Sequence, residues 1–206
     1  SMTIEFLLRE HLRSGDGRPL AMARRTLDAM AAGGINDQLA GGFARYSTDA
    51  VWLVPHFEKM LYDNAQLARL YTHAWRVTAE PRYADVARST LDFMERDLRN
   101  PPSGGFAASL DADTDGDEGG TYVWNAADVR AVLGGDATLF EAAYDVTANG
   151  NWEGRSILRR VRTTESLAAE TGLTPGQVDG RLATARARLK AARDGRPQPR
   201  RDDKVL

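Results

Sequence analysis

The sequence predicts an all-helical fold built from helix pairs, and three observations support this prediction. Apolar residues recur at steps of three and four along much of the chain, which is the spacing of one helix face. No segment alternates apolar and polar residues for long enough to form a large sheet. Polar residues collect in glycine-rich loops between the helical segments, as in a helical toroid or solenoid.

Four helices are predicted in the first half of the chain. Their apolar stripes cover residues 4–12, 20–31, 57–75 and 83–98. Pro19 lies near the start of the second helix and Pro81 opens the fourth, because proline fits the first turn of a helix. Gly33 and Gly34 end the second helix.

The second half opens with an irregular segment, residues 100–120, that holds two prolines, five glycines and a run of acids. Beyond it the patterns predict short helices, a minor β-hairpin and one long helix. These elements cover residues 125–133 and 137–144 (helices), 122–124 and 156–161 (strands) and 178–192 (helix). Thr174 and Gln177 form a capping box before the long helix, and the tail after Asp194 is expected to be extended.

The composition is that of a soluble globular protein. Of its 206 residues 42% are hydrophobic and 27% are charged, so the chain can bury a sizeable core. It has no cysteine, which excludes disulfides, thiolate zinc sites and cysteine nucleophiles within this segment. We expect a cytoplasmic protein, since no apolar run approaches the ~20 residues of a membrane span and no signal peptide opens the chain.

Charge is distributed unevenly along the chain. Residues 155–206 carry 13 Lys and Arg against 6 Asp and Glu, whereas residues 1–154 carry 14 against 23. Such an asymmetry can mark a surface for nucleic acid or for a membrane. We favour the interpretation that two parts of one molecule attract each other, and we expect neither nucleic acid nor a membrane as a partner.

The segment from Gly33 to Tyr71 is the strongest candidate for a site. His56 is expected at the N-terminal end of the third helix with Glu58 in its first turn, and with Asp63 nearby these groups could perform general acid–base catalysis. The alternatives are a loop-packing role for His56 and a helix-capping role for Glu58. Asn64 projects from the apolar stripe of the helix, so it either braces a loop or faces a cavity.

A second candidate is the acidic run that begins at Asp111. Its first half fits a calcium loop, but Tyr122 replaces the glutamate that an EF-hand needs at the twelfth position. A looser oxygen-ligand site for Ca²⁺ or Mg²⁺ is one interpretation. Alternatively, Asp111 and Asp113 point into a pocket, or the run is a solvated loop. The candidate cation ligands are Asp111, Asp113, Asp115 and Asp117.

Aromatic residues lie in or beside the same loops, and aromatic rings next to carboxylates are how proteins hold sugars. Trp52 and Trp124 are candidate stacking surfaces, although core packing is the commoner role of such residues. Arg45 and Tyr46 are further candidate substrate contacts, as is Asn64.

Residues 163–193 form a pattern similar to a helix-turn-helix. A glycine at the turn, Gly172, and a basic second helix are typical of DNA-binding motifs. Asp179 and Gly180 fall where that helix would meet phosphates, and the remainder of the chain is acidic. DNA binding is therefore a lesser alternative.

Several motifs together resemble those of the thioredoxin-domain protein family that includes spermatogenesis-associated protein 20. The matching motifs are Gly33-Gly34-Ile35, Asp37-Gln38, Gly41-Gly42-Phe43, Arg45-Tyr46-Ser47, Trp52 to Gln66, Gly104-Gly105-Phe106, Asp111-Ala112-Asp113, Glu118-Gly119, Tyr122-Val123-Trp124, Gly150 to Gly154 and Asp202 to Leu206. The run from Trp52 to Gln66 is the most specific of them. Ala44 departs from the pattern, because the family usually has histidine there.

This resemblance implies an N-terminal thioredoxin-like domain followed by an (α/α)6 toroid similar to N-acylglucosamine 2-epimerases and six-hairpin glycosidases. Residues 3–206 would then be the N-terminal half of the toroid, Ser1-Met2 a remnant of cloning, and the thioredoxin-like domain and the second half of the ring would be missing. Uncovered helix faces would favour self-association or contact with a partner, and this half alone is expected to be inactive.

Two functions follow as hypotheses for the full-length protein. The first is a sugar-binding or sugar-isomerising toroid, with His56, Glu58, Asp63, Asp111 and Asp113 as catalytic candidates. The alternative is a non-catalytic scaffold that serves a thioredoxin-like redox domain. The first hypothesis requires that residues 52–64 and 111–118 gather at one end of the molecule.

Overall fold

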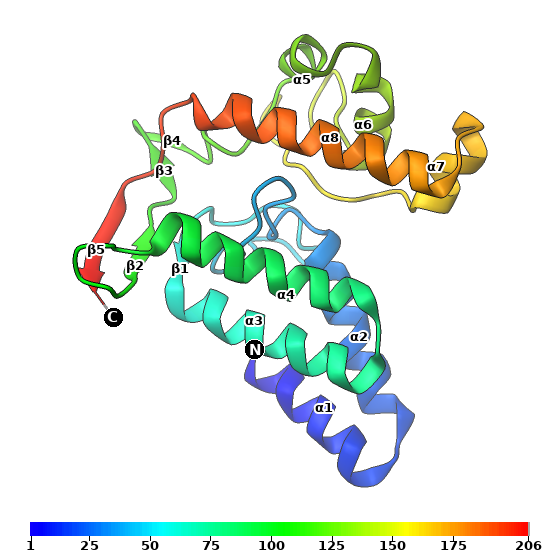
Figure 1. The fold of residues 1–206 in the computed structure, drawn as a ribbon, viewed down its shortest axis with the longest axis vertical. Coiled ribbons are helices and arrows are strands. Elements are labelled where there is room, and N and C mark those ends of the chain that lie inside the picture. The colour runs from blue at the N-terminus through cyan, green and yellow to red at the C-terminus, as the bar shows by residue number, and fades with distance from the viewer. Residues whose placement is uncertain (206) are drawn as a thin grey trace.

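The computed structural model describes residues 1–205 and is mostly helical, as the sequence predicts (Figure 1). Leu206, the last residue of the final motif, lies outside the described residues. The helices are α1 (Met2–Ser14), α2 (Gly17–Ala32), α3 (Leu61–Thr78), α4 (Pro81–Phe93) with its π-helical extension η1 (Met94–Leu98), α5 (Ala126–Leu133), the 3₁₀ turn η2 (Gly134–Asp136), α6 (Ala137–Tyr144), α7 (Thr164–Thr171) and α8 (Pro175–Asp194).

Local sequence signals set most of the helix ends. The Asp16 side chain accepts a hydrogen bond from the backbone N–H of Arg18 and caps α2. Gly15, with φ of 73°, ends α1 in the left-handed conformation that glycine adopts without strain. The predicted capping box of Thr174 and Gln177 is present at the start of α8. The capping-box prediction is confirmed.

The third helix begins later than predicted. It starts at Leu61 rather than near Phe57, so His56 and Glu58 do not lie at its N-terminal end. Burial alternates along residues 55–59, which shows that this segment is extended and presents two faces. The reason is long-range pairing, because strand β1 (Lys59–Met60) joins β2 (Ala107–Leu110) and helix cannot form there.

The strands are short and antiparallel, and they lie elsewhere than predicted. One sheet has the order β1-β2-β5, with β5 (Arg201–Val205) formed by the extended tail. A second pair, β3 (Asp113–Thr114) and β4 (Asp117–Glu118), turns around the acidic run. The hairpin expected from residues 122–124 and 156–161 is reduced to one bridge between Trp124 and Ser156.

The helices follow one another as hairpins with short connections. Two or three residues link α1 to α2, α3 to α4, α5 to α6 and α7 to α8, whereas long segments lead from each pair to the next. Figure 1 shows the loop between α2 and α3 lying between the group α1–α4 and the group α5–α8. Helix pairs of this kind are the units expected of an α/α toroid.

Two main clusters of apolar side chains form the core, one within α1–α4 and one within α5–α8. The predicted buried face of α8 is confirmed for Val178, Leu182, Ala185 and Leu189, but Arg193 rather than Ala192 continues it. In the part of the chain that the structure describes, no helix is long and apolar enough to cross a membrane.

Candidate active site

The two polar segments meet, as the first functional hypothesis requires. Strand β1 pairs with β2 directly before the acidic run, and Gly119 lies against the ring of Phe57 so closely that a Cβ atom there would come within 2.4 Å of it. Across this junction the Nδ1 atom of His56 lies 2.9 Å from the Oε1 atom of Glu118. The predicted convergence of residues 52–64 and 111–118 is therefore confirmed.

His56 is held in place by backbone and ring contacts. Its backbone N–H donates to the carbonyl of Tyr46 over 3.0 Å, and its ring stacks on the Tyr46 ring with 5.0 Å between centroids. The side chain is 35% exposed, and that of Glu118 is 45% exposed. An imidazole oriented by a carboxylate and open to solvent can accept and donate a proton.

A second set of polar residues, Arg45, Glu58 and Asp63, lies on the same loop and at the start of α3. An Arg45 guanidinium nitrogen lies 3.3 Å from a Glu58 carboxylate oxygen, and the Arg45 backbone N–H donates to the Glu58 carbonyl. Burial raises the pKa of Asp63, and the opposing effect of Arg45 is smaller. The Oδ2 atom of Asp63 is buried without a hydrogen-bond partner among the described residues. A carboxyl group of this kind keeps its proton to higher pH than usual.

The acidic run is mostly exposed. Asp111 accepts a hydrogen bond from the N–H of Ala112, and Asp113 lies in β3 with its side chain in solvent. Asp117 forms a two-pronged ion pair with Arg155, with N–O distances of 2.7 and 3.0 Å, and hydrogen bonds from Arg155 lower the pKa of Asp117. Within residues 1–205 no group of three or more His, Asp or Glu side chains could hold a metal ion. The Ca²⁺ or Mg²⁺ site stays a prediction.

Two predicted substrate contacts are structural instead. Asn64 is fully buried, and its Oδ1 atom accepts from the Phe43 N–H while its Nδ2 atom donates to the carbonyls of Phe43 and Met60. It braces the loop, which was one of the two roles expected for it. Trp124 is 1% exposed, so its ring has no free face for a sugar.

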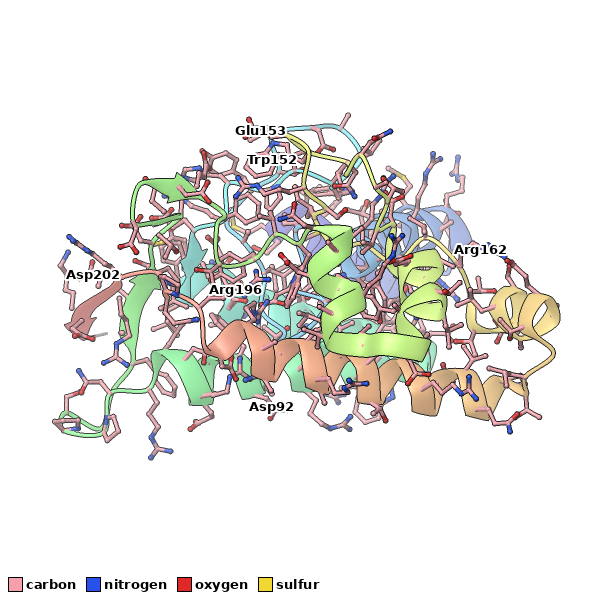
Figure 2. All side chains as sticks on the ribbon, turned by 90° about the horizontal axis from the view of Figure 1, so that it is seen from above. Asp92, Trp152, Glu153, Arg162, Arg196 and Asp202 are labelled. Carbon is pink, nitrogen blue, oxygen red and sulfur yellow. The ribbon has the colours of Figure 1, made fainter. Side chains whose placement is uncertain are left out.

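The neighbours of Trp124 and Trp52, the two candidate stacking surfaces, explain how far each ring is covered. Arg196, labelled in Figure 2, follows α8, and its guanidinium lies 3.7 Å from the centroid of the Trp124 ring. Trp52 is half-buried and packs against the core of α1–α4. Tyr46, by contrast, is 48% exposed beside His56 and is the aromatic ring best placed for a ligand.

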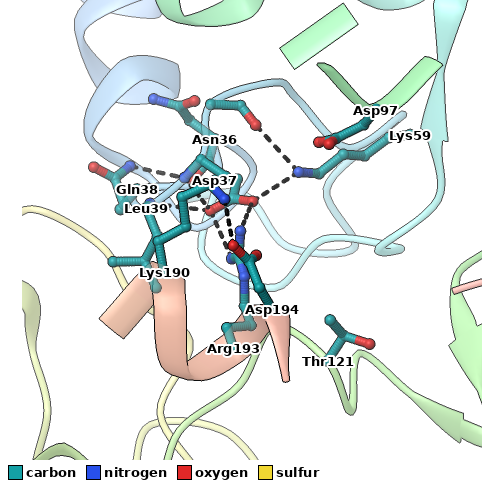
Figure 3. Close-up of polar contacts among 12 residues, drawn as sticks. Asn36, Asp37, Gln38, Leu39, Lys59, Asp97, Thr121, Lys190, Arg193 and Asp194 are labelled. Atoms are coloured by element: carbon teal, nitrogen blue, oxygen red, sulfur yellow. Dashed lines mark hydrogen bonds and ion pairs between the residues drawn. The ribbon is translucent and has the colours of Figure 1, made fainter. Parts of the chain in front are cut away.

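A buried ionic cluster was missed by the sequence analysis (Figure 3). Asp37 accepts from both terminal nitrogens of Arg193, each over 2.9 Å, and from the Nζ atom of Lys59 over 2.8 Å. The three side chains are 5–6% exposed. Both cations also face the ring of Tyr122. We call Asp37, Lys59 and Arg193 the Asp37 cluster.

The Asp37 cluster has strongly perturbed proton affinities. Burial by itself would raise the pKa of Asp37, but Arg193 and Lys59 outweigh it and hold that pKa well below its usual range. Burial lowers the pKa of Lys59, with the Arg193 charge acting in the same direction and Asp37 against it. One signal in the sequence could have revealed the cluster: Arg193 continues the apolar stripe of α8 at four residues beyond Leu189.

The helix-turn-helix pattern does form two helices, α7 and α8. Basic side chains of α8 contact the protein itself, however. Arg186 donates to the Tyr144 hydroxyl and Arg188 donates to the Leu133 carbonyl, both over 3.1 Å. Ion pairs of Arg155 with Asp117 and of Arg193 with Asp37 join the basic C-terminal part to the acidic remainder, which supports internal attraction as the reason for the uneven charge.

The chain has relatives that match nearly its whole length. Human spermatogenesis-associated protein 20 is 36% identical over 232 residues, a match that covers 100% of this chain and 29% of the human protein. The mouse protein of that name is 36% identical over 98% of this chain. The chain is homologous to a part of spermatogenesis-associated protein 20. An uncharacterized protein of Caenorhabditis elegans is 31% identical over 91% of this chain and 29% of its own length. The chain thus spans 29% of the length of these relatives.

Other comparisons add less. No family model matches the chain. A family 76 glycoside hydrolase from a bovine Bacteroides thetaiotaomicron strain superposes with a TM-score of 0.46 at 14% identity, over 89% of this chain and 33% of that one. The family 76 mannosidase Bt3792 of strain VPI-5482 gives 0.47 at 13% identity, over 91% and 41%. Likenesses at this level carry no conclusion about the fold or the activity of this chain.

Proposed function

We propose that the surface around His56 and Glu118, where residues 52–64 meet the acidic run, binds a carbohydrate. There the protein would move a proton on one of the sugar carbons, as an epimerase does. The observation that carries the proposal is the 2.9 Å contact between His56 Nδ1 and Glu118 Oε1 on a half-buried surface. An ionised carboxylate only accepts hydrogen bonds, so Nδ1 carries the hydrogen and Nε2 is left as the base. Glu118 is thus a positioning residue.

The chemistry would begin with an open-chain sugar. Nε2 of His56 takes the proton from the carbon beside the carbonyl, and the electron pair of that C–H bond moves to form an enediolate. Inversion of the carbon needs a proton delivered to the opposite face by a second acid or by water, while His56 releases the first proton to solvent. No oxidant or reductant is needed. Burial raises the pKa of Asp63, which makes this carboxyl group the candidate acid for the developing oxyanion.

The carboxylates of this end fit a glycosidase less well. Such an enzyme needs two carboxyl groups facing each other across the bond that it breaks. Glu58 is paired with Arg45, Glu118 with His56, and Asp111 and Asp113 are exposed to solvent. We therefore favour histidine-based proton transfer. Separately, we propose a cytoplasmic location, which fits the lack of cysteine.

The test follows solvent deuterium into sugars by proton NMR, with this chain and with a full-length relative. We expect deuterium at the carbon beside the carbonyl of at least one hexose or N-acetylhexosamine. In whichever protein shows exchange, replacing the histidine that corresponds to His56 by glutamine should lower the rate by about 10²-fold or more. Replacing the glutamate that corresponds to Glu118 by glutamine should lower it less.

A matched control exists within this chain. His73 Nδ1 lies 2.9 Å from Glu5 Oε2, between α3 and α1 and away from the long loops, and is equally exposed. His73→Gln should leave exchange within twofold of the wild type. If neither protein binds or exchanges any of these sugars, the proposal fails and the scaffold hypothesis gains support.

A further inference from the structure

A cavity of about 340 Å³ lies beside the Asp37 cluster. It is bounded by the loop at Asp37 and Ala40, by Lys59 of β1, by η1, by the end of α8 and by the tail up to Arg201. Burial alternates along residues 55–59, so Lys59 points to the opposite side of this segment from His56. The cavity is therefore separate from the site around His56.

The lining of the cavity is rich in positive charge. The described charged residues that line it are Lys59, Arg96, Lys190, Arg193 and Arg201, with Asp37, Asp97 and Asp194. Two of the acids already have partners, since Asp97 pairs with Arg96 and Asp194 with Lys190, each at 2.6 Å. That leaves Asp37 as the carboxylate that Lys59 and Arg193 share (Figure 3).

One buried positive charge is thus left over. Lys59 and Arg193 are 4% and 5% exposed, and one carboxylate cannot neutralise two cations. A buried charge without a counter-charge is costly, so a negative ligand in the cavity would be stabilised. The ammonium of Lys59 uses two of its three N–H groups, on Asp37 and on the carbonyl of Gly41, in the contacts of the described residues.

We propose that this cavity binds a phosphate group, either as free phosphate or as the phosphoryl group of a small metabolite. Guanidinium and ammonium groups together are the donors that phosphate prefers in proteins. Five cations and three carboxylates are the charged residues of the lining, and Arg201 also pairs with Asp203 outside it at 2.5 Å. An anion would therefore meet the charge left over in the Asp37 cluster, with the Arg201 guanidinium at the rim. The volume lies at the lower end of the range of small-molecule sites. The proposal does not depend on sugar chemistry at His56.

The test is calorimetric titration of this chain with inorganic phosphate at constant ionic strength, with chloride as the reference. Arg201→Gln removes an exposed lining residue, and Arg200→Gln removes the same charge one position away, outside the lining. We expect phosphate to bind, Arg201→Gln to weaken it about fivefold to tenfold, and Arg200→Gln to change it less than twofold. Equal heats with chloride, or equal effects of the two variants, would overturn the proposal.

A second arm identifies the source of the phosphate. Glucose 6-phosphate is titrated beside inorganic phosphate, with glucose as its unphosphorylated control. Tighter binding of the ester than of phosphate supports a phosphorylated metabolite, and equal or weaker binding supports free phosphate. Binding of glucose and its phosphate with the same affinity would show that the phosphoryl group is not recognised, which contradicts the proposal.

Discussion

At the scale of residues, Asp37 has the largest structural consequence. Its two oxygens hold cations from β1 and from α8, and Oδ1 also accepts from the N–H groups of Leu39 and Ala40. One carboxylate therefore fixes its own loop and joins elements that are far apart in the sequence. Removing one member of a buried ion cluster costs much more than the net value of the contacts, because the remaining charges stay buried without a partner.

We predict that Asp37→Asn destabilises the protein by about 3–5 kcal/mol, because Lys59 and Arg193 are then left as two buried like charges. The measurement is urea unfolding at neutral pH. Asp92→Asn, an exposed aspartate of α4, is the control and should change the free energy of unfolding by less than about 0.5 kcal/mol. A loss below about 1 kcal/mol for Asp37→Asn would contradict the assigned role.

The loss of stability caused by Asp37→Asn should depend on pH. Because the folded-state pKa of Asp37 is lowered, its contribution is fully present above the ordinary value of 3.8 and is lost as the pH falls toward the folded value. The difference in unfolding free energy between the wild type and Asp37→Asn should therefore shrink below pH 3.8, by about 1.4 kcal/mol per pH unit. A difference that stays constant down to acid unfolding would show that Asp37 is not ionised in the folded protein.

At the scale of elements, the loop after α2 is fitted closely to α4. Gly42 has φ of 79°, and a Cβ atom there would lie 2.4 Å from the Phe93 ring. Gly41 approaches the backbone of Ser89 equally closely. These contacts bring Asp37 and Asn36 into position, so the two glycines matter through packing as well as through backbone conformation.

A pair of glycine variants separates these two effects. Gly116 has φ of 81° but open space where a Cβ atom would be. Gly116→Ala should cost about 1–2 kcal/mol from the left-handed conformation alone, and Gly42→Ala should cost a further 1–3 kcal/mol or so from overpacking. Guanidinium unfolding measures both. Equal costs would mean that the loop moves away from α4 without penalty.

The start of α3 shows what local pattern could not predict. The apolar spacing continues from Phe57 into the helix, and it therefore indicated a helix from that point. Pairing of Lys59 with Leu110 and burial of the Lys59 ammonium beside Asp37 keep the segment extended. The position of His56 depends on this pairing, so its partner Glu118 could not be derived from spacing.

At the scale of the whole molecule, large apolar side chains remain exposed on α1, α3 and α4. Phe6 and Leu12 are 63% and 67% exposed, and Trp75 and Leu91 are 44% and 48% exposed. Self-association stays a prediction, and these exposed side chains are where it would be tested.

We predict concentration-dependent self-association in sedimentation velocity experiments. The double variant Phe6→Gln and Leu12→Gln should shift the protein toward the monomer, since it removes two large exposed apolar groups of α1. Val51→Gln, at an equally exposed position on the loop between α2 and α3, is the control. Strictly monomeric wild-type protein at every concentration would contradict the prediction.

The sequence by itself determined most of the helices, the capping box of α8, the buried face of that helix and the resemblance to spermatogenesis-associated protein 20, because each of these depends on local spacing or on long shared motifs. Only the tertiary structure decided the partner of His56, the bracing role of Asn64 and the Asp37 cluster. Asp37 and Arg193 are 156 positions apart, and their contact depends on how a loop meets the end of a distant helix. Local periodicity describes which face of an element is apolar, but it does not describe which charged groups share the interior.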